Sequence, residues 1–303
     1  MLYIQRNIKN HMSINQALTS AYQKLNNKKI NSAHLDAELL LSFVIKKSRE
    51  YILAHSNKKL TLTQIKKYNN LIKQRAKNIP IAYLTHEKEF YGRKFYVDER
   101  VLVPRPETEM FIDIVETRHG ASLREGKTTI IDIGTGSGCI IITLAKELQN
   151  KNIKFLATDI SKNALSVAKK NARLHNVNKK IKFLHGNLLE PILKNKNFLL
   201  HASNLQLVAN LPYLTPTQIK NSPSIKHEPK LALTAGKDGL KYYRELSAQI
   251  KTLQKLNPKI KITLLCEIDP VQVKGIKKIF SFAKNVEIKK DLADLNRIPI
   301  IKI

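Results

Sequence analysis

The 303-residue sequence predicts an α/β protein in which a mostly parallel, doubly wound sheet follows a small N-terminal all-α domain. Apolar residues recur at helical spacing over the first eighty residues, and strand-like and helix-like segments alternate from about residue 100. Between the two regions lies a short stretch that mixes aromatic residues with a glycine. The expected domains are therefore residues 1–80 (helical), 81–98 (a β-hairpin linker) and 99–303 (the sheet with its helices).

The N-terminal region contains three predicted helices. Ser13 can cap the first, whose apolar residues share one face, and the second covers residues 35–44. A third helix is expected to begin near Thr61 and to end at Pro80. Lysines on the outer faces would solvate a small helical bundle. Aromatic residues on both sides of Gly92 predict the hairpin that follows.

The remaining chain shows the alternation that is typical of a sheet wrapped by helices. Each predicted strand is followed by a turn and, in most cases, by a helix. Strands are expected at 129–133, 155–158, 181–184, 205–208, 260–267, 286–290 and 298–303, and helices at 140–148, 161–175, 240–255 and 272–280.

The net charge of +29 has two interpretations, namely a surface that faces nucleic acid or the ribosome, or a general preference for Lys, Asn and Ile. Only 11 of the 53 basic residues are arginine, the residue best suited to bases and phosphates, and the charge is spread along the chain. We therefore favour the compositional interpretation. Weak contact with RNA or the ribosome is compatible with it.

Other features of the composition narrow the class of protein. Cys139 and Cys266 lie far apart and the nine histidines are scattered, so we predict no metal site and a reducing, cytoplasmic environment. We expect no membrane association, since no run of apolar residues approaches the length of a membrane span. The first ten residues also lack the apolar segment of a secretory signal.

A glycine-rich turn, Gly134-Thr135-Gly136-Ser137-Gly138, follows the first predicted strand of the sheet. Glycine allows positive φ and lets a ligand approach the backbone closely. The spacing G-x-G-x-G differs from the G-x-G-x-x-G of dinucleotide folds, in which the helix begins beside a pyrophosphate. It suits a ligand without that group, such as S-adenosyl-L-methionine. The alternative is a tight strand–helix turn with no ligand.

The next two strands end in further candidate ligands of a nucleoside. Asp159 can accept hydrogen bonds from both ribose hydroxyls, or else belongs to the cap of the helix that begins at Ser161. Asn187 can accept from the exocyclic amine of adenine, and Leu188 can pack on the ring. The alternative for this last pair is a simple turn.

The fourth strand ends in Asn210-Leu211-Pro212-Tyr213, which resembles the Asn-Pro-Pro-Tyr motif of N-methyltransferases that act on planar nitrogens. An amide nitrogen is a poor nucleophile because its lone pair is delocalised. The Asn210 side-chain oxygen and the Leu211 carbonyl can accept its two N–H bonds and orient it. Tyr213 can pack on the flat amide and Pro212 restricts the loop. Leu211 departs from the usual proline, and taken alone the tetrapeptide could be an ordinary loop turn.

Further segments share one resemblance. Most specific is Pro104-Arg105-Pro106-Glu107-Thr108-Glu109, and the others lie at residues 36–41, 80–84, 89–92, 101–103, 227–233, 236–243 and 290–293. Together with the motifs above, they resemble the HemK-type family of protein-(glutamine-N5) methyltransferases. The resemblance covers about residue 13 to 303, and departures are Asn187 where the family often has Asp and Asp269 in place of a glycine.

This resemblance implies a Rossmann-like class I methyltransferase domain that uses S-adenosyl-L-methionine. The substrate would be the glutamine in the Gly-Gly-Gln motif of class 1 peptide chain release factors, methylated on N5, with the helical domain holding the release factor. The cofactor contacts of the family transfer to residues 134–138, Asp159, Leu188 and Asn210. We add Asn187 to the predicted cofactor-binding residues because it stands directly before Leu188. Contacts with the substrate, and catalysis, transfer to residues 210–213.

Two other functions are compatible with parts of the sequence. A nucleic-acid methyltransferase acting on adenine N6 or guanine N2 would share the glycine turn and Asn-x-Pro-Tyr, and the charge of +29 favours it. Such an enzyme needs a basic, aromatic-rich face to hold an extruded base, which the helical region does not suggest. The other function is that of a catalytically silent adaptor of translation factors, for which only Leu211 is an argument.

Overall fold

The computed structural model describes residues 12–122, 128–148, 153–195, 198 and 202–303, and it divides into two compact units. The first unit comprises the described residues up to His86 together with Pro223–His227. The second comprises Glu87–Ser222 and Glu228–Ile303.

The first unit is helical. Its helices are α1 (Ile14–Asn26), α2 (Ala33–Ile45), α3 (Arg49–Ala54), α4 (Leu62–Arg75) and α5 (Ile81–Thr85). The predicted start of the first helix is confirmed, because the Ser13 hydroxyl accepts from the Gln16 N–H at 3.2 Å while the Gln16 side chain accepts from the Ser13 N–H at 2.8 Å. Apolar residues of α1, α2 and α4, such as Leu25, Leu40 and Ile72, form its core.

Two expectations for this unit are wrong. Helix α4 begins after Thr61 as predicted, but it ends at Arg75 and not at Pro80. The chain leaves the helix because Asn78 takes a left-handed conformation with φ of 67°, which cannot continue an α-helix. The two shortest helices, α3 and α5, were not expected from the sequence, since neither is long enough to show a helical period.

The second unit contains a hairpin and a seven-stranded sheet of order β5-β4-β3-β6-β7-β9-β8. The first five strands in this order are parallel, and β9 pairs antiparallel with both β7 and β8. The predicted doubly wound, mostly parallel sheet is therefore confirmed. The strands are β1 (Glu87–Phe90), β2 (Arg93–Tyr96), β3 (Thr128–Ile133), β4 (Ile153–Asp159), β5 (Ile181–His185), β6 (Asn204–Ala209), β7 (Lys261–Cys266), β8 (Asn285–Lys290) and β9 (Asn296–Lys302).

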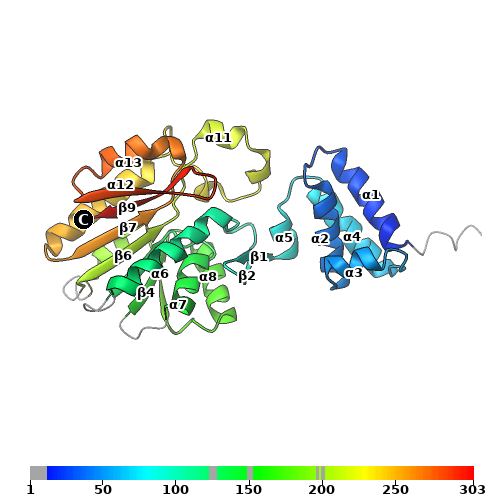
Figure 1. Cartoon of the computed structure of the whole chain (residues 1–303), viewed down its shortest axis with the longest axis horizontal. Coiled ribbons are helices and arrows are strands. Elements are labelled where there is room, and N and C mark those ends of the chain that lie inside the picture. Colours follow the sequence, from blue (N-terminus) through cyan, green and yellow to red (C-terminus); the bar gives the residue numbers. More distant parts are fainter. Residues whose placement is uncertain (1–11, 123–127, 149–152, 196–197, 199–201) are drawn as a thin grey trace, which may run out of the picture. The chain divides into compact units, whose positions relative to one another are not determined.

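Helices cover both faces of this sheet (Figure 1). Side chains alternate along each strand, so Ile130 joins the apolar core beneath α6, α7 and α8, and Ile131 joins the core beneath α12 and α13. The helices are α6 (Met110–Ser122), α7 (Cys139–Glu147), α8 (Lys162–Leu174), α9 (Glu190–Leu193), α11 (Pro216–Lys220), α12 (Lys241–Leu256) and α13 (Val273–Ile279), with single 3₁₀ turns at Pro106–Glu109, Lys230–Ala232 and Pro270–Gln272. A further 3₁₀ turn, Pro223–Ile225, belongs to the first unit.

The hairpin β1–β2 packs into the second unit. Phe90 and Phe95 are buried in the same core as α6 and α7, and their rings meet edge to face with centroids 6.1 Å apart. Residues 81–86, by contrast, belong to the first unit. The expected linker 81–98 is thus divided between the units, and the assignment of a separate role to residues 1–80, 81–98 and 99–303 stays a prediction.

The order of the strands creates a crevice at one edge of the sheet. The chain runs from β3 outward through β4 to β5, and then returns to place β6 on the other side of β3. Loops that leave the carboxyl ends of β3 and β6 therefore diverge, which is where ligands bind in open parallel sheets. Within the described ranges, no helix is both long and apolar enough to cross a membrane.

Candidate functional site

A cleft of about 1020 Å³, including its open side, lies at this crevice, and every residue of its lining belongs to the second unit. Ten of the twelve residues predicted for the site line it, while Gly138 and Tyr213 do not. The sequence-predicted residues in the lining are Gly134, Thr135, Gly136, Ser137, Asp159, Asn187, Leu188, Asn210, Leu211 and Pro212.

The glycine turn has a backbone that only glycine adopts without strain. Gly134, Gly136 and Gly138 have φ of 71°, 55° and 81°. A Cβ on Gly138 would lie 2.9 Å from Ile142 and 3.1 Å from Ala168, so this glycine lets α7 pack closely on α8. Gly136 faces open space, because the nearest atom to such a Cβ is 4.0 Å away. The turn therefore exposes its backbone to the cleft.

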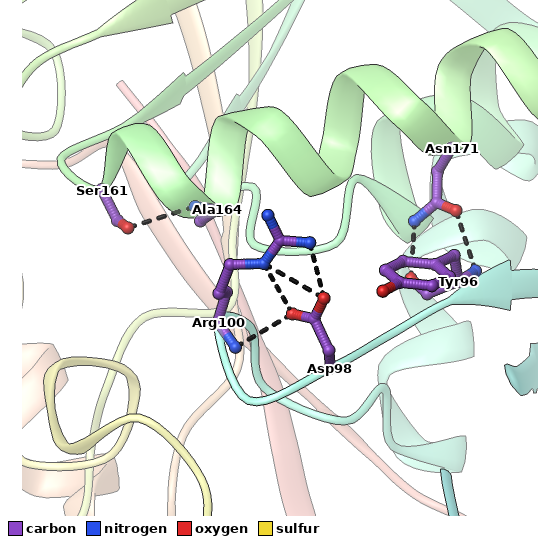
Figure 2. A network of polar contacts seen from close by, with 6 residues as sticks. All are labelled: Tyr96, Asp98, Arg100, Ser161, Ala164 and Asn171. Atoms are coloured by element: carbon purple, nitrogen blue, oxygen red, sulfur yellow. Dashed lines mark hydrogen bonds and ion pairs between the residues drawn. The ribbon is translucent and has the colours of Figure 1, made fainter. Parts of the chain in front are cut away.

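Asp159 is buried at the end of β4 and receives two backbone N–H groups. Its Oδ2 accepts from Gly136 at 2.9 Å and its Oδ1 from Ser161 at 2.8 Å. Burial raises the pKa of Asp159, while these two bonds oppose the rise. The cap of α8 is made by Ser161, whose hydroxyl accepts from the Ala164 N–H at 3.1 Å (Figure 2). Each Asp159 oxygen keeps a further lone pair for a hydroxyl donor.

Asp132 supports the turn from beneath. The Thr135 hydroxyl donates to its Oδ2 at 2.6 Å, while Oδ1 is buried with no hydrogen-bond partner among the described residues. Burial raises the pKa of Asp132 to about 7. No role was predicted for Asp132 from the sequence, although it lies only two residues before Gly134.

Asn171 joins three elements around the turn. From α8 its side-chain amide donates to the carbonyls of Ser137 at 2.8 Å and Tyr96 at 2.9 Å, and it accepts from the Tyr96 N–H at 2.8 Å. Figure 2 shows the two hydrogen bonds between the Asn171 side chain and the backbone of Tyr96 in β2. The only signal in the sequence is an asparagine on the apolar face of a helix, and sequence reasoning missed it.

One side of the cleft comes from residues 100–105, and two ion pairs hold this segment. Arg100 lines the cleft, and its guanidinium grips both oxygens of Asp98, with Nε 2.9 Å from Oδ1 (Figure 2). Arg105 pairs with the buried carboxylate of Glu228, which also accepts from the Val103 N–H at 3.0 Å. The same side of the cleft is completed by apolar residues that follow Glu228, among them Leu231.

Asn187 and Leu188 form another wall of the cleft. Leu188 has φ of 50°, an uncommon conformation for a residue with a branched side chain, and its side chain is buried against the core. The Asn187 side-chain nitrogen lies 3.4 Å from a carboxylate oxygen of Glu245. No donor to its side-chain oxygen is found among the described residues, which leaves this oxygen as an acceptor for the predicted contact with an amine.

The Asn210–Tyr213 loop follows β6. The Asn210 side-chain nitrogen donates to Thr108 Oγ1 at 3.0 Å, and the buried side chain of Leu211 packs against the glycine turn at Gly134. Tyr213 turns away from the cleft lining, since its hydroxyl donates to Glu267 Oε1 at 3.1 Å. Burial and that carboxylate raise the pKa of Tyr213 well above its usual value. Packing of its ring on a substrate amide stays a prediction that this placement does not favour.

Thr108 and Glu267 complete the site, and sequence reasoning assigned no role to either. Glu267 follows β7 and is fully buried, and burial raises its pKa to about 7. Its Oε2 accepts from the Thr108 hydroxyl at 2.7 Å, and its backbone carbonyl accepts from the Tyr243 hydroxyl. The available signals were the Pro-Arg-Pro-Glu-Thr-Glu string and an acidic residue at the end of an apolar strand. No group of His, Cys, Asp or Glu suited to a metal ion occurs in the described part of the chain.

The fold is that of a methyltransferase domain. The methyltransferase domain family matches residues 124–252, and the PrmC N-terminal domain family matches residues 16–85. Among solved structures, the hMettl16 catalytic domain in complex with MAT2A 3′UTR hairpin 1 has a TM-score of 0.54 at 16% identity, over 86% of this chain and 90% of that one. Its complex with hairpin 6 has a TM-score of 0.52. These likenesses concern the fold alone.

Curated relatives specify the family. The release factor glutamine methyltransferase of Dictyoglomus turgidum is 38% identical over 93% of this chain and 97% of its own length, and that of Bacillus cereus is 36% identical over 86% and 89%. The chain belongs to the release factor glutamine methyltransferase family, so the HemK-type resemblance is confirmed. It also matches the bifunctional methyltransferase of Rickettsia felis at 35% identity, and it spans 57% of the length of that relative.

Proposed function

We propose that the protein transfers a methyl group from S-adenosyl-L-methionine to the side-chain amide nitrogen, N5, of the glutamine in the Gly-Gly-Gln motif of class 1 peptide chain release factors. The observation that supports this most directly is the orientation of Asn210. Its side-chain nitrogen is used by Thr108, so its side-chain oxygen is left for a donor in the cleft. The names of the relatives point to the same substrate.

The cleft suits the methyl donor. Asp159 can accept from two ribose hydroxyls with the lone pairs that its backbone bonds leave, and Leu188 offers an apolar surface to adenine. The open backbone at Gly136 gives room for the amino-acid part. When bound, S-adenosyl-L-methionine supplies an electrophilic methyl group on a sulfonium.

Asn210 and Leu211 orient the substrate amide. The Asn210 Oδ1 and the Leu211 carbonyl accept its two N–H bonds, which directs the face of the nitrogen toward the methyl donor. Both acceptors also favour the positive charge that develops on the nitrogen as its amide resonance is lost. Pro212 restricts the backbone between them and Tyr213. No strong base is needed, because the proton can leave after transfer.

The proposal is tested by incubating the protein with radiolabelled S-adenosyl-L-methionine and a mixture of release factors, RNA and DNA, and then separating the products. Label on a glutamine of a release factor is the expected result, and a release factor with that glutamine replaced should stay unlabelled. Label on RNA or DNA alone would overturn the proposal in favour of nucleic-acid methylation, the function that the charge of +29 favours.

We also propose that the protein works in the cytoplasm and that its helical unit recognises the release factor. In addition, we propose that the basic surface of the protein makes weak contact with RNA or the ribosome. Cys139 and Cys266 are buried free thiols, which suits a reducing compartment. A net charge of +29 attracts polyanions with an affinity that falls as salt rises. Co-sedimentation with ribosomes that disappears between low and physiological salt would support this contact, and its absence at low salt would refute it.

A further inference from the structure

We propose that Thr108 and Glu267 are positioning residues, which fix the Asn210 side-chain amide with its nitrogen on Thr108 and its oxygen free for a donor in the cleft. The inference rests on the proposed function, in which that oxygen orients the amide of the substrate. It concerns a hydrogen-bond chain that runs from Glu267 through Thr108 to Asn210.

The orientation of an asparagine amide is decided by its partners. Its oxygen and nitrogen ends have nearly the same shape, but one only accepts hydrogen bonds and the other only donates them. One end of the Asn210 amide is hydrogen-bonded to the Thr108 hydroxyl, at 3.0 Å. A hydroxyl can donate or accept, so Thr108 alone would tolerate either orientation.

Glu267 removes this ambiguity. Burial raises the pKa of Glu267 to about 7, so its ionised fraction grows as the pH rises through 7, and its Oε2 lies 2.7 Å from the Thr108 oxygen. The ionised carboxylate only accepts hydrogen bonds. In that form the hydroxyl proton of Thr108 is used by Glu267, which leaves only lone pairs on the side that faces Asn210. Asn210 must then present its nitrogen to Thr108, and its oxygen points to the opposite side.

The chain of three residues is rigid because both of its anchors are buried. Thr108 is 2% exposed and lies in the 3₁₀ turn Pro106–Glu109, which begins with a proline. Glu267 is fully buried, and its second oxygen accepts from the Tyr213 hydroxyl at 3.1 Å. One carboxyl group thus holds residues at both ends of the Asn210–Tyr213 loop.

Reversal of the Asn210 amide would bring its NH₂ group against the NH₂ group of the substrate. Two donors cannot form a hydrogen bond, and the nitrogen would lose one of its two orienting acceptors. The loss would affect alignment in the transition state, whereas Asp159 and the glycine turn would still hold the cofactor. Disruption of the chain should accordingly lower kcat and leave cofactor affinity nearly unchanged.

The test compares Thr108→Val, which keeps the shape but cannot accept a hydrogen bond, with Thr108→Ser, which keeps the hydroxyl. We expect the Val variant to lose about 10- to 100-fold in kcat, somewhat less than the loss of a whole oxyanion donor. The Ser variant should recover to within about threefold of wild type, and the Kd for S-adenosyl-L-methionine should change less than about threefold in both. Thr143→Val is the matched control, because the buried hydroxyl of Thr143 has no partner among the described residues.

Glu267→Gln gives an independent comparison. A glutamine can turn its NH₂ group to Thr108 and so reverse the direction of the hydrogen bonds, which would favour the wrong orientation of Asn210. It should also lower kcat, and the double variant with Thr108→Val should be no worse than Thr108→Val alone, because both act through the same group. Fully additive losses in the double variant would overturn the proposal.

A second measurement does not depend on the identity of the substrate. In protein labelled with ¹⁵N-asparagine, the side-chain NH₂ signals of Asn210 are assigned by their loss in Asn210→Ala. They should exchange slowly with water in wild type and Thr108→Ser, and rapidly in Thr108→Val and Glu267→Gln. Unchanged exchange in both of the latter variants would overturn the proposal. If wild type methylates no release factor, the proposed function fails while this measurement still decides the orientation of Asn210.

Discussion

Replacement of Asn171 by alanine is expected to destabilise the second unit by about 3 kcal/mol, because three hydrogen bonds of about 1 kcal/mol each are lost. These bonds join α8 to both backbone groups of Tyr96 and to the Ser137 carbonyl. Asn171 is fully buried, so the space left by the shorter side chain adds to the cost. The Ser137 carbonyl belongs to the glycine turn, and its release should also weaken cofactor binding.

Urea unfolding monitored by far-ultraviolet circular dichroism measures this loss, since the chain has no tryptophan to serve as a fluorescent probe. Asn163→Ala is the control, because Asn163 is exposed on the same helix, and it should change the unfolding free energy by less than about 0.5 kcal/mol. A loss below about 1 kcal/mol for Asn171→Ala would refute the role of Asn171 as the link between hairpin, helix and turn.

Three further predictions concern the cleft. Asp159→Ala should weaken binding of S-adenosyl-L-methionine by about 10- to 100-fold in calorimetry, because hydrogen bonds to a charged acceptor are strong; unchanged affinity would contradict the ribose assignment. Asn210→Ala should lower kcat by about 10²- to 10³-fold with cofactor affinity within about threefold, and normal turnover would remove Asn210 from the mechanism. Glu267 has a pKa raised from 4.5 in the unfolded chain to about 7 by burial, so its contribution to stability is full below pH 4.5 and is lost as the pH rises through 7. Between pH 5 and 8 the wild type should therefore lose up to about 3 kcal/mol more unfolding free energy than Glu267→Gln, and equal losses would show that Glu267 ionises normally.

The sheet and its helices were predictable because their signals are local. The strand predicted at 205–208 is observed at Asn204–Ala209, and the helix predicted at 240–255 is observed at Lys241–Leu256. Strand alternation and helical periodicity depend only on neighbouring residues. The same is true of the glycine turn, whose spacing in the sequence already indicates positive φ.

The supporting residues of the site were not predictable, because their partners are far away in the sequence. The Thr108 hydroxyl is hydrogen-bonded to Asn210, 102 residues away in the sequence, and to Glu267, 159 residues away. No pattern in the sequence around Thr108 predicts either hydrogen bond. Tyr213 illustrates the opposite case, in which local sequence says more than the placement of the side chain favours. The tetrapeptide suggested a side chain in the cleft, but the buried Glu267 carboxylate offers its hydroxyl a partner on the other side. Local sequence thus predicted which loop lines the cleft and not how each side chain in it is directed.

The contact of Leu211 with the glycine turn makes two loops of the site depend on each other. A Cβ at Gly134 would lie 3.1 Å from the Leu211 side chain, so a side chain at position 134 would require Leu211 to shift by a few tenths of an ångström, in addition to the backbone strain at φ of 71°. In relatives with proline at the second position of the tetrapeptide, the compact proline ring would lie farther from a Cβ at position 134 than the leucine side chain does. A proline introduced at position 211 should therefore relieve this contact for an alanine at position 134, while the strain of the positive φ at position 134 would remain.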